Sequence, residues 1–157
     1  MIAVGITEEN KEIEKLISCA LKEKNIPFGK DFEDEKNRYI FMSEPFLKKC
    51  DIIINDSKKE LKSADCFIYL YNSDNKAKAC PKDSLVISYG LNSLATVTAS
   101  SIDETEDALS FQYCLQREIV SFSGKKIEPQ EFGVRLSSGT KIHSALAFVT
   151  FMLLCRL

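Results

Sequence analysis

The stretch SADCFIYLYNSDNKAKACPKDSLVISYGLNSLATVTASSID, residues 63–103, decides the fold. It begins with an apolar, aromatic-rich run at Cys66–Tyr71, which predicts a buried strand. A polar Asn-Ser-Asp turn follows, and a second strand at Leu85–Tyr89 runs into Gly-Leu-Asn. A third extended run, rich in Thr, Val and Ser, begins near Thr96. The stretch therefore predicts three strands joined by polar turns.

The chain before this stretch has the pattern of βαβ units. A short strand at Met1–Ile6 leads into an amphipathic helix at Glu8–Asn25, with Thr7 as its expected N-cap. Several short apolar strands separated by helical segments favour a parallel sheet with right-handed crossovers. The other elements expected here are a charged loop at 29–37, strands at Arg38–Met42 and Cys50–Asn55, and a helix at Asp56–Ala64.

The chain after this stretch changes character. Apolar and polar residues alternate through Phe111–Arg117, and further strands are expected at Glu118–Phe122 and Phe132–Leu136, with a turn at 123–125. A closing helix at Lys141–Leu157 is apolar on two faces, which is typical of a helix buried on more than one side. We therefore expect one α/β domain over residues 1–157. It is a Rossmann-like three-layer domain with a mostly parallel sheet, plus a small antiparallel sheet before the C-terminal helix.

Composition excludes several classes of function. A net charge of −2, with Lys and Arg interleaved among Asp and Glu, gives no bulk attraction to nucleic acid or an anionic membrane. The longest apolar run, Ala145–Cys155, is too short to span a bilayer, and no signal peptide is evident. The six cysteines form no Cys-x-x-Cys pair, and His143 is the only histidine, which argues against a zinc site. We expect a cytoplasmic protein with reduced thiols and no bound metal.

Four segments, taken in order, resemble the central ATP-binding domain of the Mur ligases. Residues 5–14, GITEENKEIE, align with the family's phosphate loop G-x-T-G-T-N-G-K-[ST]-[ST]. Residues 72–75 resemble its Asn-x-Asp-Asp turn, and 86–92 resemble the strand that ends in Phe/Tyr-Gly-x-Asn. Residues 139–147, GTKIHSALA, resemble the start of its His-Asn helix. The resemblance implies a short, degenerate form of that domain, without the family's UDP-sugar domain or its C-terminal domain.

The phosphate loop is where the resemblance is poorest. Gly5, Thr7 and Asn10 match it and are the only candidates for holding a nucleotide phosphate there. Glu8 and Lys11 replace two glycines, and side chains at these positions obstruct the approach of backbone N–H groups to phosphate. The loop's lysine is Glu12, which repels phosphate, and its magnesium-binding hydroxyl pair is Ile13 and Glu14. We therefore expect no cofactor, with ATP and Mg²⁺ entering only if the chain is an active ligase.

The later motifs supply a second set of candidates. The resemblance implies ligand-binding roles for Asn72, Asp74, Asn92 and His143, although His143 stands in a shifted register and lacks the family's asparagines. The family's Glu-x-Ser-Ser segment and the context of its carbamylated lysine have no counterpart in the sequence.

Three other groupings have chemical potential. Cys114 and His143 offer a nucleophile and a base. The acidic residues of 103–107 suit a weak cation site, or simply a solvated turn. A polar cluster could bind a small ligand or a peptide, or form an exposed sheet face. Its members are Gln112, Gln116, Arg117, Glu128 and Gln130.

Three functions follow from these observations. The first is a non-catalytic relative of the Mur ligase central domain, which binds or regulates and is linked to cell-wall metabolism by the resemblance alone. The second is an ATP-dependent amide ligase, or one subunit of it. The third is a structural subunit whose C-terminal helix pairs with itself or with a protein partner. Exposed Phe148 and Phe151 would support the third, and their burial would remove its motive.

Overall fold

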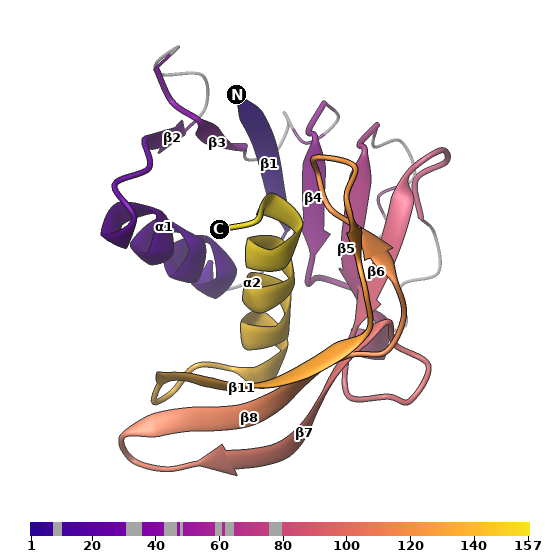
Figure 1. Cartoon of the computed structure of the whole chain (residues 1–157). Helices are drawn as coiled ribbons and strands as arrows, with labels where there is room; N and C mark the ends of the chain where they lie inside the picture. The colour runs from indigo at the N-terminus through magenta and orange to yellow at the C-terminus, as the bar shows by residue number, and fades with distance from the viewer. Residues whose placement is uncertain are drawn as a thin grey trace.

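In the part of the chain that the structure describes, a nine-stranded sheet carries two α-helices on one face (Figure 1). The computed structural model describes residues 1–7, 11–30, 36–42, 47, 49–58, 61, 65–75 and 80–157. The strands have the order β11-β8-β7-β6-β5-β4-β1-β3-β2. The elements are β1 (Ile2–Thr7), α1 (Glu12–Glu23), β2 (Phe28–Lys30), β3 (Tyr39–Met42), β4 (Ile52–Asn55), β5 (Ile68–Asn72), the 3-10 turn η2 (Ser73–Asn75), β6 (Leu85–Tyr89), β7 (Val97–Glu104), β8 (Ala108–Leu115), β9 (Ile119–Val120), β10 (Lys126–Ile127), β11 (Gln130–Ser137) and α2 (Ile142–Cys155).

The parallel half of the sheet is built from strands buried on both faces. β1 pairs in parallel with both β3 and β4, β4 pairs with β5, and β5 pairs with β6. All four residues of β4, Ile-Ile-Ile-Asn, are buried. Such continuous β-branched runs are characteristic of parallel strands covered on both sides. The predicted parallel sheet is confirmed.

The antiparallel half continues the same sheet. β7 joins β6 in parallel at Tyr89 and Val97, and then pairs antiparallel with β8. β8 pairs antiparallel with β11 over eight residues. A separate two-stranded sheet of β9 and β10 precedes α2 and closes around the turn at Gly124, whose φ is +79°. The α/β fold class with its small antiparallel sheet is confirmed, but the longest antiparallel strands belong to the main sheet.

The main core lies between the sheet and the two helices. α1 places Ile13, Ile17 and Leu21 on one buried stripe, at the spacing of an amphipathic helix. α2 is buried on several sides, as its double apolar pattern predicts. Phe151 is fully buried and meets Tyr39 edge to face, with ring centroids 6.0 Å apart.

The opposite face of the sheet carries a smaller core. It is formed by Ile40, Met42, Leu47, Cys50, Ile53, Cys66 and Tyr69, with Leu61 packed against them. The helix expected at 56–64 lies largely outside the described residues, and the described residues 56–58 are not helical. The predicted three-layer arrangement has a covering layer on each face of the sheet. On one face the described layer consists of α1 and α2, and on the other face the described residues that cover the sheet are Leu47 and Leu61.

The start of α1 differs from its prediction. The helix begins at Glu12, four residues after the expected Glu8, and Thr7 ends β1 instead of capping the helix. Lys11 occupies the N-cap position with φ 55°, in the left-handed region, and its side chain makes no capping hydrogen bond. The predicted loop at 29–37 also differs, because Phe28–Lys30 forms β2 beside β3.

The C-terminal helix gives a direct test of the core. Phe151→Ala should lower the free energy of unfolding by about 3–5 kcal/mol, because a fully buried aromatic side chain leaves a cavity. Phe148→Ala, three residues earlier on the same helix, removes a ring that is only half-buried and should cost less than half as much. Urea unfolding of both variants measures the difference. Equal losses would contradict the packing described here.

Candidate functional site

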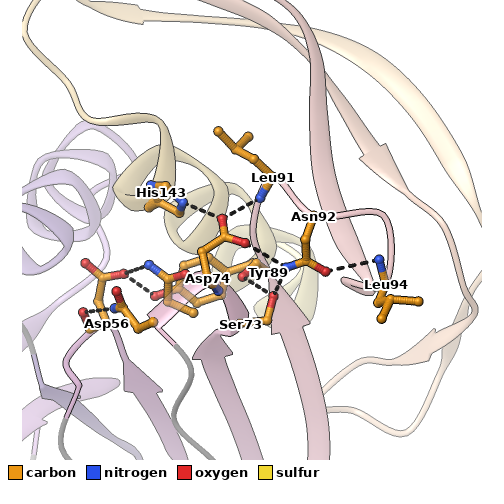
Figure 2. Close-up of polar contacts among 10 residues, drawn as sticks. Asp56, Ser73, Asp74, Tyr89, Leu91, Asn92, Leu94 and His143 are labelled. Carbon is orange, nitrogen blue, oxygen red and sulfur yellow. Dashed lines mark hydrogen bonds and ion pairs between the residues drawn. The ribbon is translucent and has the colours of Figure 1, made fainter.

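Polar side chains gather at the carboxyl ends of β4, β5 and β6, beside the first turn of α2 (Figure 2). In open α/β sheets, ligands bind outside the carboxyl ends of the parallel strands. Three of the predicted ligand candidates, Asp74, Asn92 and His143, meet here in one hydrogen-bonded cluster. The fourth, Asn72, joins the cluster through the backbone N–H of Asp74, which donates to Asn72 Oδ1 at 3.0 Å.

Asp74 is the centre of this cluster. Its Oδ2 accepts a hydrogen bond from the Leu91 N–H at 2.7 Å and lies 2.7 Å from His143 Nε2. Its Oδ1 accepts from Asn92 Nδ2 at 2.7 Å. The same Asn92 Nδ2 donates to Ser73 Oγ, and Asn92 Oδ1 accepts from the Leu94 N–H at 3.0 Å. Asp74 thus joins the end of β5 to the loop after β6 and to α2.

A second carboxylate, Asp56, organises the neighbouring strand ends. Its Oδ1 accepts from Asn72 Nδ2 and from the Tyr89 hydroxyl, each at 2.9 Å. Its carbonyl oxygen accepts from Asn75 Nδ2 at 2.8 Å, and its N–H donates to the Thr7 carbonyl oxygen. Asp56 therefore links the residue after β4 to β1, β5 and β6. The sequence placed Asp56 only at the start of an expected helix, although its position directly after a buried strand was a signal for this edge.

The hydrogen bonds to Asp74 favour its charged form. Burial opposes ionisation, but the donors Asn92, Leu91 N–H and His143 outweigh it and hold the pKa of Asp74 below its ordinary value of 3.8. Side-chain exposure is 28% for Asp74 and 30% for His143, so both reach solvent only in part. The cluster is therefore a half-buried charged hydrogen-bond network in which the protein itself supplies the donors.

Gly90 is required by the close approach of this network. A Cβ at this position would lie 2.8 Å from Ser73 Oγ and 2.9 Å from Asp74 Cγ. Both atoms are held by their own hydrogen bonds, so they cannot move away without breaking them. The glycine of the Tyr-Gly-Leu-Asn motif is therefore explained by packing within this chain, as well as by the resemblance to the Mur ligases.

The phosphate-loop candidates have structural roles where they are described. Gly5 lies inside β1, and a Cβ there would lie 2.7 Å from Leu47 Cδ2. The Thr7 hydroxyl donates to Asn55 Oδ1 at 2.6 Å, and Asn55 Nδ2 donates to the Tyr69 hydroxyl at 2.7 Å. Asn10, the third candidate, lies outside the described residues. Gly5 and Thr7 thus serve the smaller core and a buried polar chain.

A carboxylate stands where the two helices begin. Glu12 opens α1, and its Oε1 and Oε2 lie 3.4 Å and 3.3 Å from the backbone N of Lys141, the N-cap of α2. Negative charge is favoured at helix N-termini, so Glu12 takes the place that an anion prefers.

The pairing of Cys114 with His143 is not seen. The sulfur of Cys114 contacts Ser100 Oγ and the Gln112 carbonyl oxygen, whereas His143 contacts Asp74. Burial raises the pKa of the Cys50 and Cys155 thiols to about 12, which keeps both protonated.

The remaining groupings stay without an assigned ligand. Asp103, Glu104, Glu106 and Asp107 are exposed around the turn between β7 and β8. Gln116 of the polar cluster donates to the Ala95 carbonyl oxygen at 3.2 Å, a structural contact.

Within the described part of the chain, no group of three or more His, Cys, Asp or Glu side chains could hold a metal ion. The described helices include none that is long and apolar enough to cross a membrane.

An open groove of about 480 Å³ lies at the other end of α2. Its walls are residues 126–130, around β10 and the start of β11, and four residues at the end of the chain, Met152, Leu153, Arg156 and Leu157. Glu128 and Gln130 of the predicted polar cluster line it, whereas Asn72, Asp74, Asn92 and His143 do not.

This architecture defines a Mur ligase-like fold. No protein-family model matches the sequence, and no curated protein matches it. Solved structures do match the fold. A UDP-N-acetylmuramoylalanyl-D-glutamyl-2,6-diaminopimelate–D-alanyl-D-alanyl ligase from Acinetobacter baumannii aligns with 99% of this chain and 43% of its own, at a TM-score of 0.63 and 11% identity.

Two further structures give the same result. MurF from Acinetobacter baumannii has a TM-score of 0.61 at 11% identity, covering 99% of this chain and 43% of that one. A UDP-N-acetylmuramoyl-L-alanyl-D-glutamate–2,6-diaminopimelate ligase has a TM-score of 0.59 at 12% identity, covering 99% and 42%. The chain thus spans less than half the length of these ligases. At such low identity the likeness concerns the fold alone.

The low pKa of Asp74 predicts a pH-dependent contribution to stability. The charged network stabilises the fold above pH 3.8, and this stabilisation is lost as the pH falls through the lower pKa of the folded state. Asp74→Asn should lower the free energy of unfolding by about 1 kcal/mol at neutral pH, and the loss should shrink below pH 3.8. Urea unfolding across this range, with exposed Asp107→Asn as control, measures it. A loss that does not change with pH would contradict the assignment.

Gly90→Ala should lower the free energy of unfolding by about 1–3 kcal/mol, because the added methyl overlaps Ser73 and Asp74. Gly133→Ala is the matched control, since its Cβ would meet only Gln112 Nε2, at 3.6 Å. Thermal unfolding of both variants in dilute solution provides the comparison. Equal melting temperatures of the two variants would contradict this requirement for Gly90, because they would show that the loop after β6 moves aside with no loss of stability.

Proposed function

We propose that the chain is a non-catalytic relative of the Mur ligase central domain and works as a binding or regulatory protein. One observation carries the proposal. At the edge where α/β sheets take their ligands, the side chains of Asp56, Asn72, Asp74 and Asn92 are hydrogen-bonded to one another and to the backbone. Polar groups already paired within the protein gain little from binding a nucleotide in their place.

The start of α1 supports the same conclusion. Phosphate loops present backbone N–H groups and a lysine to the anion. Here Lys11 takes the left-handed N-cap position, and the Glu12 carboxylate lies beside the N-cap of α2. A carboxylate at this point repels a triphosphate and already meets the preference of a helix N-terminus for negative charge.

An active ATP-dependent amide ligase would need a different phosphate site and its own magnesium ligands. ATP and Mg²⁺ belong only to that alternative. The structural-subunit hypothesis gains no support from Phe151, which is fully buried, and Phe148 is half-buried against the main core. A link to cell-wall metabolism rests on the likeness of fold alone.

The proposal predicts that nucleotides do not stabilise the protein. A ligand that binds the folded state raises the melting temperature when its concentration is well above its dissociation constant. Thermal unfolding with millimolar ATP, ADP or a UDP-sugar, each with and without Mg²⁺, should give no shift. A known ATP-binding protein, measured alongside, is the positive control.

A magnesium-dependent increase with ATP would overturn the proposal and favour ligase chemistry. Glu12→Ala then identifies the place of binding. This substitution removes the repelling carboxylate, so a larger increase in the variant would locate the nucleotide at the start of α1.

A further inference from the structure

The strand β11 forms one edge of the nine-stranded sheet (Figure 1). Its inner neighbour β8 pairs with it without interruption from Gln130 to Ser137. Burial alternates along β11: Phe132, Val134 and Leu136 are half-buried against the core, and the residues between them are exposed. An eight-residue edge with regular alternation is long for a free edge and suits pairing with another strand.

Gly133, at the middle of this strand, has no requirement within the chain itself. Its backbone is not among those with positive φ, and a Cβ there would meet only Gln112 Nε2, at 3.6 Å. The pairing with β8 has no bulge at this position. Glycine inside a strand marks a bulge, a sharp bend or the close approach of another backbone. The unbroken register excludes the bulge, and the place of Gly133 on an edge strand suits the approach of another backbone.

Two opposite charges flank this glycine symmetrically. Glu131 and Arg135 lie two residues before and after it, and both are exposed on the same side of the sheet. In the described part of the chain neither side chain forms an ion pair. The sequence Glu-Phe-Gly-Val-Arg is therefore complementary to itself when read in opposite directions.

We propose that two copies of the chain pair along β11, antiparallel, with Gly133 of both copies at the two-fold axis. In this register Glu131 stands opposite Arg135 of the partner subunit, and Arg135 opposite Glu131 of the partner subunit. On the core side, Phe132 stands opposite Val134 of the partner subunit. Cross-strand pairs of opposite charge, and of aromatic with β-branched residues, are those that stabilise antiparallel strands.

The alternative registers are worse. Two residues that stand opposite each other in an antiparallel pair have their side chains on the same face of the sheet. When two identical strands pair about a two-fold axis, this condition is met only if the axis passes through a residue position and not between two residues. An axis at Phe132 or Val134 leaves Glu131 and Arg135 without opposed charges. An axis at Glu131 or Arg135 places like charges directly opposite each other, which is destabilising. Charge complementarity thus selects a second copy in one register.

Sedimentation of the whole chain, from micromolar to near-millimolar concentration, tests the proposal. The wild type should show a concentration-dependent monomer–dimer equilibrium. Glu131→Arg and Arg135→Glu should each raise the dissociation constant at least about tenfold, because each variant places two like-charge pairs opposite each other. Glu23→Arg, at the exposed end of α1, changes the net charge by the same amount as Glu131→Arg and should leave the equilibrium unchanged.

An equimolar mixture of the two weakened variants separates charge pairing from misfolding. In the mixed pair, every Arg faces a Glu, so a heterodimer of wild-type affinity should form. A monomeric wild type at the highest concentration would overturn the proposal. So would single variants that dimerise like the wild type, or a mixture that stays monomeric while the wild type dimerises.

Discussion

Two carboxylates hold the carboxyl edge of the sheet, and the arrangement of loops and helix around it depends on them. Asp56 follows β4 and accepts hydrogen bonds from Asn72 on β5 and Tyr89 on β6. Asp74 follows β5 and accepts from the Leu91 N–H and from Asn92, and contacts His143 on α2. Buried or half-buried carboxylates are costly unless they are hydrogen-bonded. Satisfying these two fixes the turns after β5 and β6 and the position where α2 begins.

The parts of this structure that could be predicted are those set by local pattern. The β-branched run of β4 and the spacing of Ile13, Ile17 and Leu21 each determine their own element. The start of α1 could not be predicted, because Lys11 adopts a left-handed conformation that has no local signature. The role of Asp56 was also missed, since its partners on β5 and β6 are brought near only by the parallel sheet.

The likeness to the Mur ligases is strong in the fold and weak in the residues of the phosphate loop. The fold aligns over 99% of the chain at 11% identity, because burial on both faces of a parallel sheet can be met by many apolar residues. A phosphate loop has no such freedom, and Glu12 stands where its lysine is expected. The motif residues Asp74, Asn92 and His143 do meet in space, yet here they bind one another. The likeness to the ligases therefore concerns the architecture of the chain.

We propose that the carboxyl edge of the sheet is closed by its own hydrogen bonds and takes no nucleotide. A crystal structure determined after growth with millimolar ATP and Mg²⁺ tests it most directly. We expect Asp74 to keep its contacts with Leu91, Asn92 and His143, with no nucleotide density at the ends of β4, β5 and β6. Ordered nucleotide at this edge, with Asp74 released from these partners, would contradict the account.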